Sequence, residues 1–404
     1  MSNSATPSDE KLSGSGTSLY DAAINELNKL LLVLENITNA ITTSKYNPFY
    51  YHGALPQFYL WVLFLSGLLL FAYYIPTVDN AYLSPSKNLI NAWTSVQYIT
   101  DKLPFGGVIR AIHRYAGDAM VIFIVLHAIR VWFTDRYRQY RWVQWVTGIV
   151  LLLMVLFIGQ TGFLLAWDDR ALLLTRMTAS ALDWLPMVGG PLKTAFINGE
   201  TITNLTLSNF LFIHIGLSFA LLFVLWLHYV RMTRPVITPP PAINYILVAV
   251  ILLVAFMFPV TSGKMADLNT TPTSFDIDWF FLFPYTFMLA VPMWVFWVGG
   301  FIIAFVSLVL PWLVRNVSPP VIPAEVVIDK CTGCSLCFKD CPYQAIEMVP
   351  APAGSRFKLL ATVKTARCSS CGICVGACAF DAIDLPQLTD SDITARIKEL
   401  VEAK

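Results

Sequence analysis

The strongest constraint on the fold is a series of six apolar segments, each close to the length that a bilayer requires. They run at about residues 56–75, 110–133, 143–166, 209–231, 243–260 and 287–313. A helix of about 20 apolar residues spans the hydrocarbon core of a membrane. Hydrophobic residues make up 56% of the chain and charged ones only 13%, whereas soluble domains carry roughly 25% charged residues. The sequence therefore predicts an all-α transmembrane bundle of six helices.

Basic residues at the ends of these segments predict how the bundle is oriented. Arg130 and the stretch TDRYRQYR follow the second segment, Arg231 and Arg234 follow the fourth, and Arg315 follows the sixth. Because loops rich in Lys and Arg stay in the cytoplasm, six crossings return both termini to that side. The net charge of +1 gives no indication of a nucleic-acid partner, and we expect none.

Four of the five histidines lie inside apolar segments, in two pairs of equal spacing. His113 and His127 share the second segment, and His214 and His228 share the fourth, each pair 14 residues apart. Fourteen residues make about four helical turns, which puts both side chains on one face about 21 Å apart. A lone intramembrane histidine is often only a packed or hydrogen-bonded residue. Four at matched spacing instead favour a function, namely two stacked haems, each between imidazoles of different helices.

Glycines repeat the same spacing on the first and third segments. Gly53 and Gly67 lie 14 residues apart, as do Gly148 and Gly162. Glycine lets a planar group approach a helix backbone closely. If neighbouring helices alternate in direction, the outer level consists of Gly67, His113, Gly162 and His214, and the inner level of Gly53, His127, Gly148 and His228.

All eight cysteines lie between Cys331 and Cys378, in two runs that share one spacing. Each run reads C-x2-C-x2-C-x3-C, as in bacterial ferredoxins with two clusters, where the fourth cysteine ligates the other cluster. Structural zinc is the alternative, but it favours pairs of CxxC across a long loop. We expect an α+β ferredoxin-type domain in a reducing compartment. Its first 4Fe–4S cluster takes Cys331, Cys334, Cys337 and Cys378, and its second takes Cys368, Cys371, Cys374 and Cys341.

The segment before the first apolar span predicts a helix lying on the membrane surface. Leu30, Leu34 and Ile37 recur at helical spacing, while Glu26 and Glu35 belong to the opposite, charged face. An amphipathic helix of this kind lies in the interface plane.

Shifts in composition, including two proline-rich hinges, divide the chain into six segments. We expect a disordered cytoplasmic tail at 1–18, the surface helix at 19–45, a di-haem four-helix core at 46–238, a two-helix segment at 239–317, the ferredoxin domain at 318–388 and a terminal helix at 389–404.

Several stretches of the sequence resemble the cytochrome b family of quinol-oxidising complexes, and most of all its b6f type. They are SLYD…ITTSKYNPFYYHG, YYIPTVDNAY, SVQYITDKLPFGGVIRAIHRYAGDAM and WVTGIVLLLMVLFIGQTGFLLAWDD, within about residues 19–315. The resemblance implies that His113 and His214 ligate an outer b haem, and that His127 and His228 ligate an inner one. Tyr51 stands where the b6f type has the cysteine of an extra haem, so no covalent third haem is expected.

The segment IDWFFLFPY at 277–285 resembles the family's Pro-Glu-Trp-Tyr motif at the outer quinol-oxidation site. Asp278 stands at the position of the glutamate, so the resemblance implies a quinol proton acceptor there, with Trp279 and Phe280 beside it. Ile277 and Phe280 depart from the family's Pro and Tyr. Residues 184–190 resemble the short outer-surface helix that walls this pocket. The alternative is an aromatic interface belt with a solvated aspartate.

Together these features predict a membrane subunit of a quinol or quinone oxidoreductase complex in a bacterial or archaeal cytoplasmic membrane. Electrons would pass from an outer quinol site through two b haems to two cytoplasmic 4Fe–4S clusters. Expected partners are lipid and quinone, a periplasmic Rieske-type, c-type cytochrome, dehydrogenase or hydrogenase subunit, a cytoplasmic electron carrier and a second copy in a homodimer. The alternative is an electron conduit that anchors a periplasmic hydrogenase or dehydrogenase without oxidising quinol. Complete ligand sets argue against a third possibility, a scaffold without redox function.

Overall fold

The computed structural model describes two compact units of the chain. The described residues are 19–43, 46–78, 91–134, 137–138, 141–197, 202–230, 236–270, 280–313, 323–341, 343–368 and 372–386, with Lys398 and Glu402. The helical unit comprises Gly16–His228 and Val236–Leu313, and the cysteine-containing unit includes Val314–Lys404. The tail predicted at 1–18 lies outside the described residues, as does nearly all of the terminal helix predicted at 389–404.

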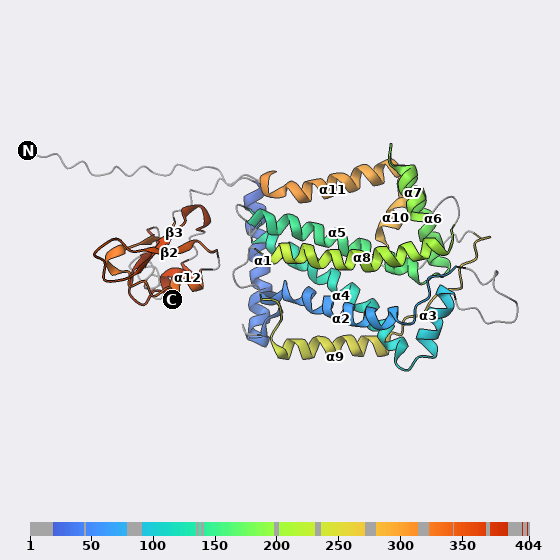
Figure 1. Cartoon of the computed structure of the whole chain (residues 1–404), viewed down its shortest axis with the longest axis horizontal. Coiled ribbons are helices and arrows are strands. Elements are labelled where there is room, and N and C mark those ends of the chain that lie inside the picture. Colours follow the sequence, from blue (N-terminus) through green and yellow to red (C-terminus); the bar gives the residue numbers. More distant parts are fainter. Residues whose placement is uncertain are drawn as a thin grey trace, which may run out of the picture. The chain divides into compact units, whose positions relative to one another are not determined.

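Within the described residues, five helices are long and apolar enough to cross a membrane. They are α2 (Ala54–Phe71), α4 (Gly106–Phe133), α5 (Trp142–Leu165), α8 (Asn204–Tyr229) and α11 (Met293–Leu313). Figure 1 shows them lying side by side, and α4 packs against both α2 and α5. The predicted multi-pass helical fold is confirmed.

The fifth and sixth predicted spans differ from expectation in their bounds, because prolines interrupt them. The fifth is α9 (Pro241–Met257), an apolar helix of 17 residues at the lower limit for a crossing. It ends where Phe258, which precedes Pro259, leaves the helical region at φ −125° and ψ 75°, as the residue before a proline tends to do. The sixth divides into α10 (Phe283–Ala290) and α11, because Val291 is extended before Pro292.

The predicted surface helix is present as α1 (Leu19–Thr42), which lies across the ends of the bundle helices (Figure 1). Leu30, Leu34 and Ile37 are exposed on it, which suits a helix lying at a lipid interface. Glu35 differs from the expectation, since it is buried rather than on the charged outer face.

Short helices close the opposite end of the bundle, namely α3 (Ala92–Asp101), α6 (Asp169–Asp183), α7 (Gly189–Ile197) and α10 (Figure 1). Asp168 caps α6 by accepting a hydrogen bond from the backbone N–H of Ala171 at 2.9 Å, as N-cap aspartates do. Its other oxygen accepts from the N–H of Gly263 at 3.0 Å, which ties a distant loop to this end. Residues 184–190, expected to form a short helix, instead contain the turn between α6 and α7.

The cysteine-containing unit repeats a strand–turn–helix–strand arrangement, in agreement with the predicted α+β domain. The first half holds β1 (Glu325–Val326), α12 (Leu336–Asp340) and β2 (Ile346–Pro350), and the second holds β3 (Leu359–Val363), α13 (Ile373–Gly376) and β4 (Ile383–Asp384). β1 pairs with β4 and β2 with β3, both antiparallel, with Glu325 opposite Asp384 and Ile346 opposite Val363. The two halves therefore exchange strand partners and share one core.

Candidate functional site

At the level away from α1, two histidines from different helices face each other. The imidazoles of His113 on α4 and His214 on α8 have their ring centres 6.3 Å apart. Gly67 on α2 and Gly162 on α5 back them: a Cβ added to either would stand 3.1 Å from Cε1 of the nearest imidazole. A larger residue at these glycines would press directly on a histidine ring.

The level next to α1 repeats this arrangement. Gly53, just before α2, lies against His127, and Gly148 on α5 lies against His228. An added Cβ would stand 3.5 Å and 3.4 Å from the Cε1 atoms of these two rings. The structure thus brings together, level by level, the histidines and glycines that the sequence predicted.

Hydroxyl groups fix the orientation of three of the four imidazoles. Ser66 donates a hydrogen bond to the carbonyl of Val62 at 2.6 Å, and its oxygen lies 3.0 Å from Nδ1 of His113. Because the hydroxyl proton is already used, the oxygen accepts the Nδ1–H of the histidine. That tautomer leaves Nε2 unprotonated and able to bind a metal.

The same arrangement recurs on α5. Thr161 donates to the carbonyl of Ile158 at 2.7 Å and lies 3.2 Å from Nδ1 of His214. Thr147 donates to the carbonyl of Val143 at 2.7 Å and lies 2.9 Å from Nδ1 of His228. In general, a hydrogen bond to the nitrogen that does not bind the metal holds a metal-ligating histidine in position and raises its basicity.

Each of the two levels, with its two histidines backed by two glycines, fits one haem bound between the two imidazoles. A metal held at about 2 Å from each imidazole nitrogen separates two rings by roughly the distance between His113 and His214. Apolar helices surround both levels, as suits a large planar porphyrin, and the glycines leave both imidazoles unobstructed.

Sequence reasoning missed the three hydroxyl residues, although a signal for them exists. Ser66, Thr147 and Thr161 each directly precede one of the predicted glycines. They therefore share the helical spacing of the glycines, and a search for polar residues beside each glycine would have found them.

The described part of the predicted quinol motif lies beside the level of His113. Phe281 is buried, and its ring packs against Gly117 of α4 and Gly159 of α5, where an added Cβ would stand 3.6 Å and 2.1 Å from the ring. Gln160 also donates to the carbonyl of Phe281 at 3.3 Å. Asp278 and Trp279 lie outside the described residues, and Phe280 is partly buried.

A charged pair missed from the sequence lies on α4 next to this segment. Arg114 donates to Asp118 at 2.5 Å, and both side chains are largely buried. The guanidinium of Arg114 also stands 4.7 Å over the ring of Phe163, which neighbours Phe281. The outer level therefore contains fixed charges as well as aromatic rings.

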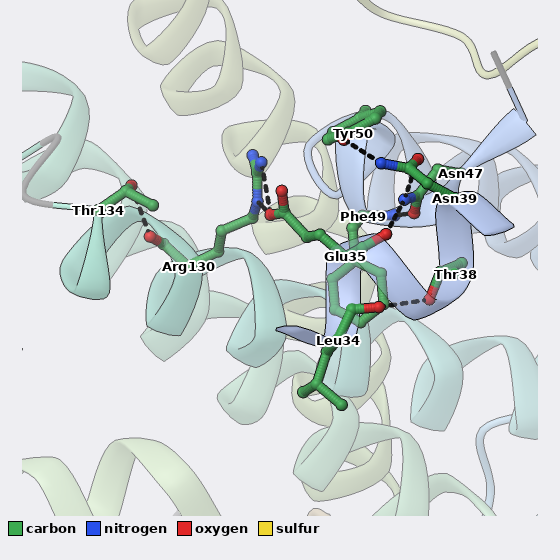
Figure 2. A network of polar contacts seen from close by, with 9 residues as sticks. All are labelled: Leu34, Glu35, Thr38, Asn39, Asn47, Phe49, Tyr50, Arg130 and Thr134. Carbon is green, nitrogen blue, oxygen red and sulfur yellow. Dashed lines mark hydrogen bonds and ion pairs between the residues drawn. The ribbon is translucent and has the colours of Figure 1, made fainter. Parts of the chain in front are cut away.

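At the other end of the bundle, a polar network fixes α1 to α4 and to the chain leading into α2 (Figure 2). Arg130, one turn beyond His127, donates to Glu35 of α1 through two nitrogens, both at 2.8 Å. Asn47 is fully buried and donates to the backbone carbonyl of Glu35 at 3.0 Å and to Asn39 at 2.8 Å. This network explains why Glu35 is buried, because its charge is paired with that of Arg130.

His52 lies between this network and the inner level. It is 6% exposed, and its Nδ1 has no hydrogen-bond partner. Burial, followed by the nearby charge of Arg130, lowers the pKa of His52 to about 4. The side chain is therefore neutral at physiological pH.

In the cysteine-containing unit, a pocket is lined by the predicted first ligand set, Cys331, Cys334, Cys337 and Cys378. Cys378 belongs to the second run, so the fold places it beside the first three cysteines, as the predicted crossover requires. Burial raises the pKa of the Cys337 thiol to about 11, and the sulfurs of Cys334, Cys331 and Cys378 add to this effect.

The second predicted set is described at Cys341, Cys368 and Cys374, whereas Cys371 lies outside the described residues. Backbone N–H groups point at the sulfurs in a repeated pattern. Ala345 donates to Sγ of Cys341 and Ala382 to Sγ of Cys378, both at 3.3 Å. Hydrogen bonds to sulfur are one of the means by which a protein tunes cluster potentials.

Comparisons with known proteins agree with these two units. A family model described as cytochrome b/b6/petB matches residues 37–235, and a 4Fe-4S dicluster domain model matches residues 330–382. The menaquinol:cytochrome c reductase cytochrome b subunits of Geobacillus thermodenitrificans and Bacillus subtilis are each 30% identical to this chain over 193 residues, which are 47% of this chain and 81% of each relative. The cytochrome b6 of Synechocystis sp. is 29% identical over 217 residues, covering 54% of this chain and 93% of its own length.

A solved structure shares the fold. A chain of the "Hyperthermophilic respiratory Complex III" superposes with a TM-score of 0.54 at 19% identity, covering 72% of this chain and 83% of its own.

Proposed function

This chain belongs to the cytochrome b/b6 family and carries a 4Fe-4S dicluster domain, and on that basis we propose that it is the electron-transferring membrane subunit of a quinol or quinone oxidoreductase complex. Electrons would pass from an outer quinol site through two b haems to cytoplasmic 4Fe–4S clusters. The observation that carries the proposal is the repeat, at two levels, of facing histidines backed by glycines.

Each of the four histidines has one role in this proposal. His113 and His214 ligate an outer haem b, and His127 and His228 ligate an inner one. A bound b haem supplies reversible one-electron transfer, and the protein supplies its ligands and surroundings. Gly67 and Gly162 leave the outer imidazoles in place, as Gly53 and Gly148 do at the inner level.

The cysteines hold two 4Fe–4S clusters in the proposed function. One takes Cys331, Cys334, Cys337 and Cys378, and the other takes Cys368, Cys371, Cys374 and Cys341. Both clusters draw a ligand from each half of the domain, so the fold and the clusters stabilise each other. By the positive-inside rule this domain and both termini lie in the cytoplasm.

The outer quinol site lies beside Phe281, between α4 and α5. Asp278 takes a proton from the quinol hydroxyl, with Trp279 and Phe280 forming the adjoining wall. The buried packing of Phe281 against Gly117 and Gly159 supports this placement, since Gly117 lies about one helical turn from His113 on α4.

The partners follow from the two ends of this pathway. On the outer side a one-electron acceptor is needed, of the Rieske or c-type cytochrome class, and relatives whose names include cytochrome c reductase support this choice. On the cytoplasmic side the clusters deliver electrons to a soluble carrier. A second copy of the chain completes a homodimer.

The substitution Asp278→Asn tests the outer site. We expect it to slow haem reduction by added quinol strongly, while reduction by dithionite is unchanged, because only the quinol reaction needs the proton acceptor. Asp267→Asn, at an exposed position on the same end of the bundle, serves as the matched control and should behave as wild type.

The opposite result identifies the other candidate. If Asp278→Asn reduces as fast as wild type, the chain is a conduit for a periplasmic hydrogenase or dehydrogenase and does not oxidise quinol itself. Copurification of such a subunit from mild detergent would support that outcome independently.

A further inference from the structure

Three of the four imidazoles are held by the residue that precedes the glycine behind them. Ser66 precedes Gly67 and binds Nδ1 of His113 at 3.0 Å. Thr161 precedes Gly162 and binds His214 at 3.2 Å, and Thr147 precedes Gly148 and binds His228 at 2.9 Å. This regular pattern raises the question of which residue bonds Nδ1 of the fourth histidine, His127.

The residue before the fourth glycine, Gly53, is His52. Gly53 stands against His127 much as the other three glycines stand against their histidines. An added Cβ at Gly53 would stand 3.8 Å from Nδ1 of His127, compared with 3.6 Å, 3.6 Å and 3.9 Å at Gly67, Gly162 and Gly148.

The backbone before Gly53 also differs from that before the other three glycines. At those three positions a helical turn precedes the glycine, so its carbonyls are available: that of Ile158, for example, accepts from Nδ1 of His214 at 2.9 Å. Gly53 is the N-cap of α2, preceded by a 3-10 turn (Pro48–Tyr51). Within the described residues, no backbone carbonyl or hydroxyl bonds His127.

We propose that His52 is the positioning residue for His127, accepting its Nδ1–H so that Nε2 faces the iron of the inner haem. This inference rests on the proposed function, because it requires a haem between His127 and His228. Two features of His52 fit the task. Its side chain is 6% exposed, and its Nδ1 has no partner, although a buried polar atom normally has one.

The surroundings of His52 favour the neutral form that this role requires. The nearby cation is Arg130, whose charge is paired with Glu35, and the ring of Phe49 packs against His52 with centres 5.2 Å apart. A neutral imidazole has one nitrogen that accepts and one that donates. It can therefore replace the hydroxyl oxygen found beside the other three histidines.

A hydrogen bond accepted from an axial histidine makes that ligand more basic and stabilises ferric iron. Removing it should therefore raise the midpoint potential of that haem alone. The test is a redox titration of the purified full-length protein, read by visible and EPR spectra, with the variants His52→Leu and His52→Ser. His52→Ser is the matched control, because it installs the hydroxyl present at Ser66.

We expect His52→Leu to raise the midpoint of the inner haem and change its EPR signal, or to lower its occupancy, with the outer haem unchanged. His52→Ser should remain close to wild type. If His52→Leu leaves both haems as in wild type, the inference is wrong. It is also wrong if Leu and Ser shift the inner haem equally, since His52 would then act on a group that only an imidazole reaches, such as a propionate or a quinone.

The wild-type titration separates this inference from the proposed function. A wild-type protein with a single haem would overturn the proposed function, and the inference with it, before any variant is made. Two wild-type haems with an unchanged His52→Leu variant would overturn the inference alone.

Discussion

Individual residues decide whether a planar cofactor fits between these helices. Gly162 packs closely against His214, since an added Cβ would stand only 3.1 Å from Cε1 of that ring. Ordinary carbon contacts need about 3.5–4.0 Å, so any larger residue must push the imidazole away. The hydroxyl of Thr161, the residue before Gly162, lies 3.2 Å from Nδ1 of the same ring and favours one tautomer.

The first prediction concerns this close approach. Gly162→Val should displace His214 and cause the loss of the outer haem, while the inner haem remains. Gly216→Val is the control, because Gly216 lies on the same helix as His214 and has no atom within 4 Å of an added Cβ. Haem content and the visible spectrum of the purified variants measure the effect. Equal haem content in both variants would contradict the predicted fit.

The second prediction concerns the hydroxyl. Thr161→Val keeps the shape of the side chain and removes its acceptor, so the outer haem should titrate at a higher potential. Thr161→Ser restores the hydroxyl and should return the potential toward wild type. A redox titration followed in the haem absorption band reads both, and an unchanged Thr161→Val midpoint would show that the hydroxyl does not act on His214.

At the scale of whole elements, pairing between distant segments determines which helix ends are fixed. α1 is attached to the bundle by Glu35 and Arg130 and by a hydrogen bond of 2.6 Å between the hydroxyls of Tyr20 and Tyr137. The periodicity of residues 19–42 was sufficient to predict a surface helix. It could not reveal that Glu35 turns inward, because its partner lies on another helix far along the chain.

The third prediction tests the attachment of α1. Glu35→Gln leaves the charge of Arg130 buried without a counterion, which in general costs about 3–5 kcal/mol. We expect a lower thermal transition and faster proteolysis of α1 in detergent. Glu26→Gln, which removes the exposed pair with Lys29, should change little, since exposed pairs contribute about 0–1 kcal/mol. Matching behaviour of the two variants would show that the buried pair does not anchor α1.

Element boundaries were the least predictable part of the fold, and the reasons are local. Apolar runs indicated the correct helices, but Pro259 ended α9 early and Pro292 separated α10 from α11. The histidines and glycines were found from spacing alone, because a helix converts equal spacing into a shared face. Arg114 and Asp118 were not found, since nothing in their spacing distinguishes them from other intramembrane charges.

At the scale of the whole molecule, two units of different chemistry are joined in one chain. The helical unit holds four histidines in an apolar interior, and the other unit holds two runs of cysteines whose predicted ligand sets exchange one cysteine. The equal offset between the two cysteine runs predicted this exchange, and Cys378 does line the pocket of the first run. The order of carriers between the units remains part of the proposed function.

The fourth prediction follows from the ligand exchange. Cys378→Ser should abolish the same cluster EPR signal as Cys334→Ser, although Cys378 belongs to the other run, and the second cluster should persist in both. EPR spectra of the dithionite-reduced variants, with iron and sulfide content, give the comparison. Loss of different signals in the two variants would mean that each run binds its own cluster.

The most direct test of the central claim is a redox titration of the purified full-length chain, followed in the visible spectrum, with haem and iron quantified in the same sample. The account predicts two low-spin haems per chain, each with two histidine ligands, together with iron for two 4Fe–4S clusters. A preparation that binds one haem or none, or whose haems lack two histidine ligands, would contradict it.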